Sequence, residues 1–277
     1  MPEAARKRTY IFKFVSTKKL LIHPTAVIHP RAKIGPGCEV GPYCVIGEYV
    51  ELGEKCKLHS HIVIDGHTTL GRENDIYPFC SIGLGAQDTK VKSGINRTVI
   101  GSHNIFREYV SIHGPGGEGG YTRIGSHNHI LAYGHIAHNV QLGDRITMIN
   151  VATLGGHVIV EDCAVIGGLA AVHQYCRVGT MSMIGGCSKV VQDIPPYMIC
   201  DGSPAGSRTI NKVGLERNGV SEETQNVLKK AYKILFRGDL GGTNALAKIE
   251  NDLPQLPEVK HLVQFVRASE RGISKCK

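Results

Sequence analysis

A six-residue repeat constrains this 277-residue chain more than any other feature of its sequence. Apolar residues recur at every sixth position from Ile22 to Ile82, from Ile100 to Ile112, and from Ile124 to Val190. The repeat lapses over residues 85–98 and 114–123, yet all three stretches share one frame. An α-helix has about 3.6 residues per turn and would spread these positions around its circumference. The repeat therefore excludes a helix face and favours short strands joined by turns.

Glycine follows the repeated apolar residue in many hexads, as in Ile34-Gly35 and Val40-Gly41, and the chain holds 34 glycines and no tryptophan. We expect these glycines to supply the unusual backbone angles of a turn. In this pattern the chain resembles the hexapeptide-repeat family, whose members fold as left-handed parallel β-helices. The resemblance implies that three hexads close one triangular coil, so residues three hexads apart stack at about the 4.8 Å spacing of neighbouring strands.

The six-residue frame ends at Pro195-Pro196, and the patterns that follow are typical of helices. Ser221 can cap a helix that ends near Gly238, and two further helices are expected over residues 243–252 and 257–271. We therefore predict a mainly β fold with a small C-terminal α-helical domain. Its parts are a basic N-terminal extension (1–21), a left-handed parallel β-helix (22–196) with loops at 85–98 and 114–123, and a C-terminal helical domain (197–277).

The nine cysteines indicate reduced thiols, because their number is odd, their positions are scattered and no CxxC spacing occurs. Five of them share the fifth place of their hexads, where a small buried residue packs well. These five are Cys38, Cys44, Cys56, Cys80 and Cys176. No apolar run near the amino terminus is long enough for a signal peptide or a membrane span. We expect a cytoplasmic protein without stable membrane insertion.

The net charge of +8 is concentrated at the two ends of the chain. Residues 1–20 and residues 207–277 each contribute +5, which leaves −2 for the middle. A nucleic-acid-binding protein more often carries basic groups with interleaved aromatics along its main folded surface, so we expect no nucleic acid partner. Basic ends suit an acidic protein partner or an anionic ligand.

Stacking of residues three hexads apart places three chemically useful residues in one column, namely His138, Gly156 and Gln174. Beside them run Asn139, His157 and Tyr175, with His135 and His173 close by. An imidazole titrates near neutral pH, so His138 could take a proton from a hydroxyl group that attacks a carbonyl carbon. The backbone N–H of Gly156 could then receive the negative charge that develops on the carbonyl oxygen. This arrangement suggests acyl transfer.

Two other interpretations of the same histidines stay open. They could be polar side chains on a solvated face of a purely structural β-helix. They could also form a zinc site, since three histidines can hold a catalytic zinc ion. The β-helical carbonic anhydrases, which resemble this chain in their repeats, include a pair of zinc-binding histidines five residues apart, and no such pair occurs here. We therefore expect no metal.

Several longer strings resemble the UDP-N-acetylglucosamine 3-O-acyltransferases, which begin lipid A synthesis. They include "GHTTLGRENDIYPFCSIG", "HIAHN", "TLGGHVIVEDCAVIGG" and "AVHQYCRVG", and the resemblance covers residues 22–272. It implies transfer of a long (R)-3-hydroxyacyl chain from acyl carrier protein, an acidic helical protein, to the 3-position of UDP-N-acetylglucosamine. It implies no bound cofactor, because the acyl group arrives on the phosphopantetheine of the carrier. It also implies a homotrimer with its sites between neighbouring prisms.

The resemblance assigns roles residue by residue. His138 matches the general base and Gly156 the oxyanion donor, and Gly186 matches the position that limits acyl-chain length. The positions that match substrate-binding residues are Gln87, Asp88, Lys90, His135, His157, His173, Gln174, Asn211 and Arg217. The chain departs from the family's usual residues at Asn139, where an aspartate is common, and at Pro204 and Asn218. The sequence does not separate O-acylation from N-acylation of a 3-amino UDP-sugar or of an acylated glucosamine.

Overall fold

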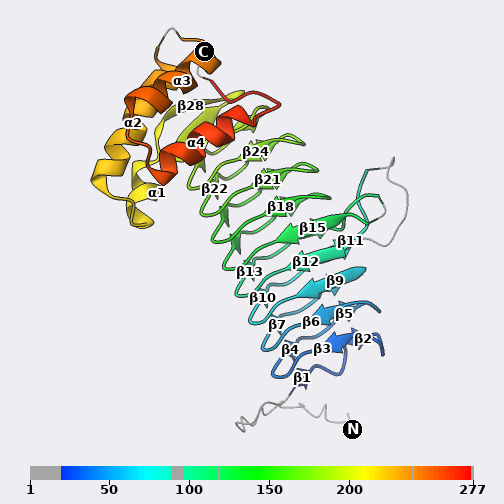
Figure 1. Ribbon diagram of the computed structural model, residues 1–277. Helices are drawn as coiled ribbons and strands as arrows, with labels where there is room; N and C mark the ends of the chain where they lie inside the picture. The colour runs from blue at the N-terminus through cyan, green and yellow to red at the C-terminus, as the bar shows by residue number, and fades with distance from the viewer. Residues whose placement is uncertain (1–19, 89–96, 118, 239, 276–277) are drawn as a thin grey trace, which may run out of the picture.

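The structure, a computed structural model, describes residues 20–88, 97–117, 119–238 and 240–275. Most of this chain forms a prism of stacked coils, and the C-terminal helices lie at one end of it (Figure 1). The predicted left-handed parallel β-helix with a small helical C-terminal part is confirmed. The expected N-terminal extension, residues 1–21, lies almost wholly outside the described residues.

Short strands form the three sheets of the prism, and each sheet takes one strand from each coil. The first sheet contains β1 (Leu21–Ile22), β4 (Glu39–Val40), β7 (Lys57–Leu58), β10 (Asp75–Ile76), β13 (Ile105–Phe106), β16 (His129–Ile130), β19 (Thr147–Met148), β22 (Val165–Ile166) and β25 (Met183–Ile184). The second contains β2 (Val27–Ile28), β5 (Val45–Ile46), β8 (Val63–Ile64), β11 (Ser81–Leu84), β14 (Ser111–His113), β17 (His135–Ile136), β20 (Thr153–Leu154), β23 (Ala171–Val172) and β26 (Lys189–Val190). The third contains β3 (Lys33–Ile34), β6 (Glu51–Leu52), β9 (His67–Leu70), β12 (Arg97–Ile100), β15 (Tyr121–Ile124), β18 (Gln141–Leu142), β21 (Ile159–Val160) and β24 (Arg177–Val178).

The strand pairing shows how the prism accommodates the two lapses in the repeat. Neighbouring strands within a sheet are usually three hexads apart, as in the pair Leu21↔Glu39. The offset is five hexads for Asp75↔Ile105 and four hexads for Ile105↔His129, so the first loop adds two hexads and the second adds one. Both additions are whole numbers of hexads, which is why the frame in the sequence survives them. Both loops leave the prism at the same edge, between β11 and β12 and between β14 and β15.

The glycine after each apolar residue is needed for close contact between coils. A Cβ atom on Gly35 would lie 2.6 Å from the carbonyl carbon of Gly53 in the next coil, which is too close for any side chain. The left-handed backbone angles occur two residues after Gly35 and Gly41, at Gly37 (φ 74°) and Tyr43 (φ 59°). The expectation that the first glycine supplies the turn angles is therefore wrong, because the distance between coils and not the dihedral angle excludes a side chain there.

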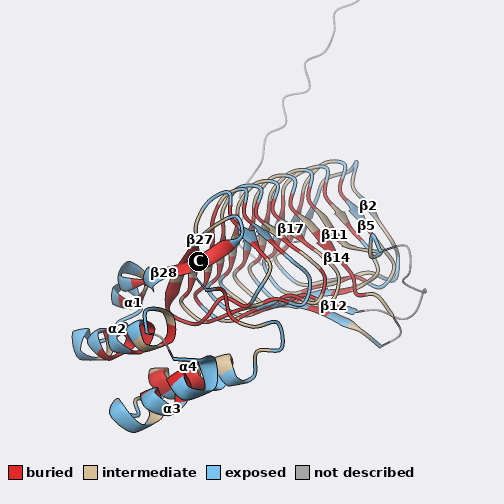
Figure 2. Ribbon diagram, turned by 90° about the horizontal axis from the view of Figure 1, so that it is seen from above, coloured by how far each residue is buried: buried red, intermediate tan, exposed pale blue. Residues whose placement is uncertain are grey.

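Inward side chains of the strands form a continuous apolar core, which Figure 2 shows as the buried inner side of the coils. The five cysteines at the fifth place of their hexads are buried in it, so their prediction as packing residues is confirmed. Burial raises the pKa of the Cys80 thiol to about 12 and that of Cys176 to about 11. These two thiols therefore stay protonated at neutral pH.

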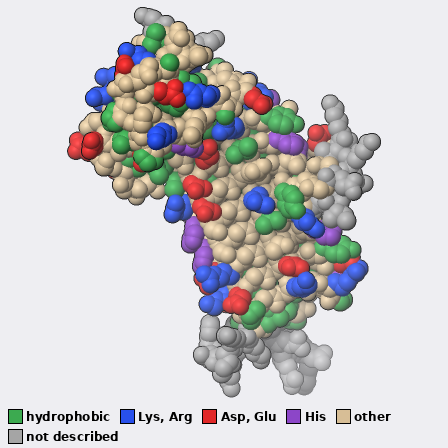
Figure 3. Space-filling view, in the orientation of Figure 1, with side chains coloured by type: hydrophobic (Ala, Val, Ile, Leu, Met, Phe, Trp, Pro, Cys, Tyr) green, Lys and Arg blue, Asp and Glu red, His purple; other side chains and the backbone are tan. Residues whose placement is uncertain are grey.

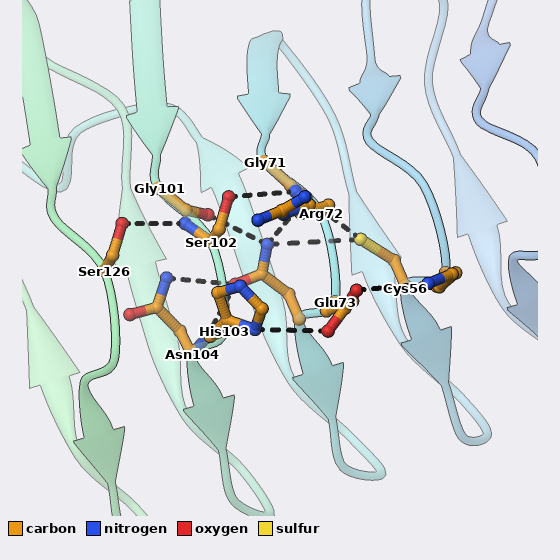
Figure 4. Close-up of polar contacts among 11 residues, drawn as sticks. Cys56, Gly71, Arg72, Glu73, Gly101, Ser102, His103, Asn104 and Ser126 are labelled. Carbon is orange, nitrogen blue, oxygen red and sulfur yellow. Dashed lines mark hydrogen bonds and ion pairs between the residues drawn. The ribbon is translucent and has the colours of Figure 1, made fainter.

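Buried asparagines form a hydrogen-bonded ladder behind the edge between the third and first sheets, and Figure 4 shows one of them, Asn104. The Asn104 amide nitrogen donates to the carbonyl oxygen of Gly125 at 3.0 Å and to Oδ1 of Asn74 at 2.9 Å. Its own Oδ1 accepts the backbone N–H of Asn128 at 2.9 Å. Each coil thereby satisfies buried polar groups of the next, which fixes the register between coils.

The chain after Pro195-Pro196 begins with a β-hairpin, which the helical patterns did not predict. Its strands β27 (Met198–Gly202) and β28 (Ala205–Ile210) are antiparallel and extend the first sheet beyond β25. Helices α1 (Lys212–Arg217), α2 (Glu222–Phe236), α3 (Gly242–Asp252) and α4 (Pro257–Arg267) follow. The hydroxyl oxygen of Ser221 accepts the N–H of Thr224 and so caps α2, as expected. None of the helices in the described part of the chain has the length and apolar character needed to cross a membrane.

Candidate active site

Three corners of the prism stack in one column on the edge between the second and third sheets, which we call the site edge. The corner after β17 contains His138, and the corners after β20 and β23 contain Gly156 and Gln174. The regular three-hexad register of these strands places the corners directly above one another. The structure thus brings the three residues together as the repeat predicts.

The imidazole of His138 lies against the backbone of Gly156. A Cβ atom on Gly156 would be 2.6 Å from both Nε2 and Cε1 of this ring, so no side chain fits between them. Among the described residues, the N–H of Gly156 has no hydrogen-bond acceptor. A nitrogen base and an unused backbone donor therefore face the same small space.

Asn139 contacts the other side of the imidazole. Its Oδ1 lies 2.9 Å from Nδ1 of His138 and accepts the backbone N–H of Gly116 at 2.9 Å. Its own backbone N–H donates to Oγ1 of Thr122 at 2.9 Å. Gly116 and Thr122 belong to the second loop and its return to the prism, so this loop contacts the site edge directly.

Two further predicted histidines surround His138. The ring of His157 lies 5.2 Å from that of His138 at 86°, and it stacks on Tyr175 at 4.6 Å. The Nδ1 atom of His135 makes a 2.7 Å hydrogen bond with the hydroxyl of Ser111. Burial lowers the pKa of both His135 and His157, with a smaller contribution from a neighbouring histidine. These rings are neutral near pH 7 and can bind a substrate as hydrogen-bond partners.

His113 belongs to the same cluster, and the sequence did not predict it. Its ring lies 5.2 Å from that of His135, and only 6 % of the residue is exposed. Burial lowers its pKa, and the nearby His138 adds to the shift. The strand pair Ser111↔His135, with an offset of four hexads, brings His113 to this cluster. A count in steps of three hexads does not find this pair, because the second loop adds one hexad. A count that allowed for the added hexad could have found it.

The remaining residues predicted on or near this edge are spread more widely. His173 and Gln174 are exposed, and Nδ1 of His173 lies 3.1 Å from the carbonyl oxygen of Gln174 and 3.4 Å from a guanidinium nitrogen of Arg271. Arg271 reaches this corner from the far end of the chain and was not predicted. Gln87 and Asp88 are exposed on the first loop. Lys90 lies outside the described residues.

The structure places Asn211 and Gly186 on other edges of the prism. Asn211 is buried, its amide nitrogen donates to the carbonyl oxygen of Met181 at 2.8 Å, and its Oδ1 caps α1 at Gly214. Met181 belongs to the edge between the third and first sheets. Gly186 is exposed on the edge between the first and second sheets. Within one chain these residues do not adjoin His138.

Arg217 is exposed in the last turn of α1. As for metal ligands, the described histidines, cysteines, aspartates and glutamates form no group of three or more that could hold a metal ion.

Sequence comparisons identify relatives over most of the chain. A curated protein of Thermodesulfovibrio yellowstonii, an acyl-[acyl-carrier-protein]–UDP-N-acetylglucosamine O-acyltransferase, is 48 % identical over 218 residues, which are 78 % of this chain and 84 % of that protein. The chain belongs to the UDP-N-acetylglucosamine O-acyltransferase family. The family profile described as "Udp N-acetylglucosamine O-acyltransferase; Domain 2" matches residues 193–274, and the bacterial transferase hexapeptide profile matches residues 20–54.

Solved structures of the family share the fold along nearly the entire chain. LpxA of Acinetobacter baumannii is 39 % identical, with a TM-score of 0.89 over 92 % of this chain and 99 % of that one. The UDP-N-acetylglucosamine acyltransferase of Arabidopsis is 37 % identical, with a TM-score of 0.82 over 92 % of this chain and 100 % of that one. The match therefore includes both the prism and the C-terminal helices.

Proposed function

We propose that this protein transfers a long (R)-3-hydroxyacyl chain from acyl carrier protein to the 3-hydroxyl group of UDP-N-acetylglucosamine, the first step of lipid A biosynthesis. The relative from Thermodesulfovibrio yellowstonii is named for acyl transfer from the carrier to this sugar nucleotide. The observation that carries the proposal is the contact of the His138 imidazole with the Gly156 backbone. It joins a base and an oxyanion donor in one column.

In this mechanism Nε2 of His138 takes the proton of the sugar 3-hydroxyl while its oxygen bonds to the thioester carbonyl carbon. The carbonyl oxygen becomes negative and accepts the N–H of Gly156. Collapse of this intermediate re-forms the carbonyl group and breaks the carbon–sulfur bond. The leaving thiolate of the phosphopantetheine takes the proton from the imidazolium, which returns the enzyme to its starting state. No bound cofactor takes part.

Substrate contacts are assigned to the neighbouring residues of the site edge and of the C-terminal part. We assign them to Gln87, Asp88, Lys90, His135, His157, His173, Gln174, Asn211 and Arg217. Gly186 is proposed to leave room for a long acyl chain, since a Cβ atom there would meet only the carbonyl oxygen of Gly168, at 3.3 Å. Because Asn211 and Gly186 lie on other edges than His138, a second copy of the chain is needed to bring such residues to one site.

An exposed row of stacked rings supports self-association as a homotrimer. The edge between the first and second sheets, which we call the aromatic edge, carries Tyr43, His61, Phe79, Tyr109 and Tyr133, with neighbouring rings 4.8 to 5.0 Å apart. Tyr43 and Tyr133 are 58 % and 56 % exposed. A rotation axis that runs along this edge brings the residues of the edge close to their own copies, so charged residues there would repel one another. The aromatic edge carries no charged residue in this row and suits such an axis.

Basic side chains on α2 favour an acidic carrier protein as the donor. Lys229, Lys230 and Lys233 are exposed on this helix, and Figure 3 shows Lys and Arg side chains spread over the helical part of the molecule. The positive electrostatic potential of these side chains accelerates the association with an acidic partner at low salt concentration. Seven cysteines in the described part of the chain are free thiols, which suits the reducing cytoplasm that we propose as its location; they are Cys38, Cys44, Cys56, Cys80, Cys163, Cys176 and Cys187.

The proposal is tested with purified protein and a series of 3-hydroxyacyl carrier-protein thioesters of different length. Each is incubated with UDP-N-acetylglucosamine or with its 3-amino analogue, and the products are weighed by mass spectrometry. We expect an ester of the 3-hydroxyl group and a preference for long chains. Amide formation alone would assign the enzyme to N-acylation, and no acyl transfer to either acceptor would refute the proposal.

A further inference from the structure

The second loop and its return to the prism contact the backbone and the side chain of Asn139 at three points. The N–H of Gly116 donates to its Oδ1 at 2.9 Å, and Oγ1 of Thr122 accepts its backbone N–H at 2.9 Å. At the third point, a Cβ atom on Gly120 would lie only 3.0 Å from Nδ2 of Asn139. The glycine at position 120 therefore leaves just enough room for the amide group.

The contact with Gly116 determines which end of the Asn139 amide faces His138. The oxygen and nitrogen of an asparagine amide have nearly the same shape, so shape alone does not orient the group. A backbone N–H can only donate, and the atom 2.9 Å from Gly116 must therefore be the amide oxygen. The same oxygen lies 2.9 Å from Nδ1 of His138, which must then carry a proton in order to donate to it.

We propose that Gly116 and Asn139 are positioning residues that fix the tautomer of His138. With the proton on Nδ1, the neutral ring has its lone pair on Nε2, the nitrogen that faces Gly156. The reversed amide would place two N–H donors against each other at Gly116 and would leave Nε2 protonated. This proposal deepens the proposed function, on which the need for a base at Nε2 rests.

An asparagine at position 139 needs such a device, whereas an aspartate would not. Both oxygens of a carboxylate accept hydrogen bonds, so an aspartate at position 139 would select the same tautomer in either orientation. An asparagine selects it in only one of its two orientations. The second loop supplies the donor that distinguishes them.

A double-mutant cycle separates this role from a structural one. Gly116→Pro removes the N–H donor, and with Asn139 present it should lower kcat/KM roughly 10- to 100-fold, because the amide is then free to reverse and the ring to carry its proton on Nε2. In the Asn139→Asp background the same substitution should change kcat/KM less than about twofold, since either carboxylate oxygen accepts the Nδ1 proton. Equal losses in the two backgrounds, or no loss with Asn139 present, would overturn the proposal.

The tautomer itself is read from the ¹⁵N NMR spectrum of protein with labelled histidine rings, with the His138 signals assigned by their loss in His138→Gln. At a pH where the ring is neutral, we expect the proton on Nδ1 in the wild-type protein and in Gly116→Ala, which keeps the N–H, and on Nε2 in Gly116→Pro. A wild-type ring protonated on Nε2 overturns the proposal even if Gly116→Pro does not fold. Because no substrate is present, this result is independent of whether the enzyme transfers the expected acyl group.

Discussion

Two edges of the prism carry histidines at neighbouring positions of their corners and use them differently. The edge between the third and first sheets, which we call the polar edge, holds His103 and His127, whose rings stack at 4.8 Å with 9° between their planes. Glu73 in the preceding coil lies 3.3 Å from Nδ1 of His103. On the site edge, His138 stands at 86° to His157. Rings at the position of His103 stack between coils on both edges, since His157 stacks on Tyr175. The site edge adds an upright imidazole at the preceding position of the corner, where the polar edge has Ser102 and Ser126.

The two edges also differ in whether a side chain of the next coil accepts the backbone N–H of the corner. On the polar edge the hydroxyl of Ser102 accepts the corner N–H of Arg72 at 3.1 Å, and that of Ser126 accepts the N–H of Ser102 at 3.0 Å (Figure 4). On the site edge, Gly156 has the equivalent corner N–H, and no described side chain accepts it. A donor that stabilises the stack on one edge is therefore available to a substrate on the other.

The strongest test of this contrast removes one histidine from each edge. His138→Ala should lower kcat roughly 1,000-fold, because it deletes the general base. His103→Ala should leave kcat within about twofold, since His103 makes no contact with the site edge in the described structure. Steady-state kinetics at saturating substrate, with circular dichroism to verify folding, would decide the matter. Equal losses in the two variants would remove the distinction between the edges.

Gly156→Ala should have the next largest effect and lower kcat roughly 100-fold. The added methyl group would overlap the His138 ring and displace it from the oxyanion donor. On the aromatic edge, Gly168→Ala is a matched control, because its Cβ would lie no closer than 3.3 Å to a neighbouring atom. The two variants should differ in kcat and agree in melting temperature. An active Gly156→Ala enzyme would contradict the geometry of the site.

Behind the polar edge, Asn104→Ala should reduce stability without affecting chemistry. The substitution leaves the buried N–H of Asn128 without its acceptor and should lower the free energy of unfolding by about 2 kcal/mol. Asn226→Ala on the exposed face of α2 should change it by less than about 0.5 kcal/mol. Urea unfolding measures both values. A loss of kcat in folded Asn104→Ala would show that the polar edge also contributes to catalysis.

Asn139→Asp should change the pH dependence of kcat/KM at the site edge. A carboxylate next to the ring stabilises the imidazolium, so the ring keeps its proton to a higher pH. The acidic limb of the kcat/KM profile should then lie at a higher pH than in the wild-type enzyme. An unchanged limb would mean that another group controls it.

The smallest expected effect concerns the acid stability of the buried histidines. Burial lowers the pKa of His113 and His135 in the folded protein, so below about pH 6.5 the unfolded chain binds more protons and the stability falls as the pH falls. His113→Gln should reduce this loss by up to about 1 kcal/mol. Urea unfolding at pH 7.5 and pH 5.5, compared with the wild type, measures the difference. A steeper loss of stability in the variant would show that the pKa of His113 is not lowered in the folded protein.

Sequence periodicity predicted the prism because the apolar residue of each hexad indicates which side chain points inward, and the spacing between hexads indicates where the chain turns. The same count placed His138, Gly156 and Gln174 in one column, since no loop interrupts the chain between them. It missed His113, which an added hexad separates from the column, and Arg271, which arrives from the C-terminus. These contacts depend on where loops leave and return, which the repeat does not encode.

The C-terminal part was less predictable because its signals are local. The Ser221 cap identified the start of α2, whereas the β27–β28 hairpin depends on pairing with β25, an interaction distant in the sequence. Asn211 matched a substrate-binding position of the family, and the structure also gives it a structural role as the cap of α1. Resemblance alone did not reveal this second role.

The stacking of His138 on Gly156 has a practical consequence for enzyme design. Their separation equals one rung of the backbone, about 4.8 Å, and is set by interstrand pairing that every coil repeats. A change in the distance between the two residues would require breaking the backbone hydrogen bonds to the coils on either side. A different acceptor specificity or acyl-chain length must instead come from the surrounding side chains, while the distance between His138 and Gly156 stays the same.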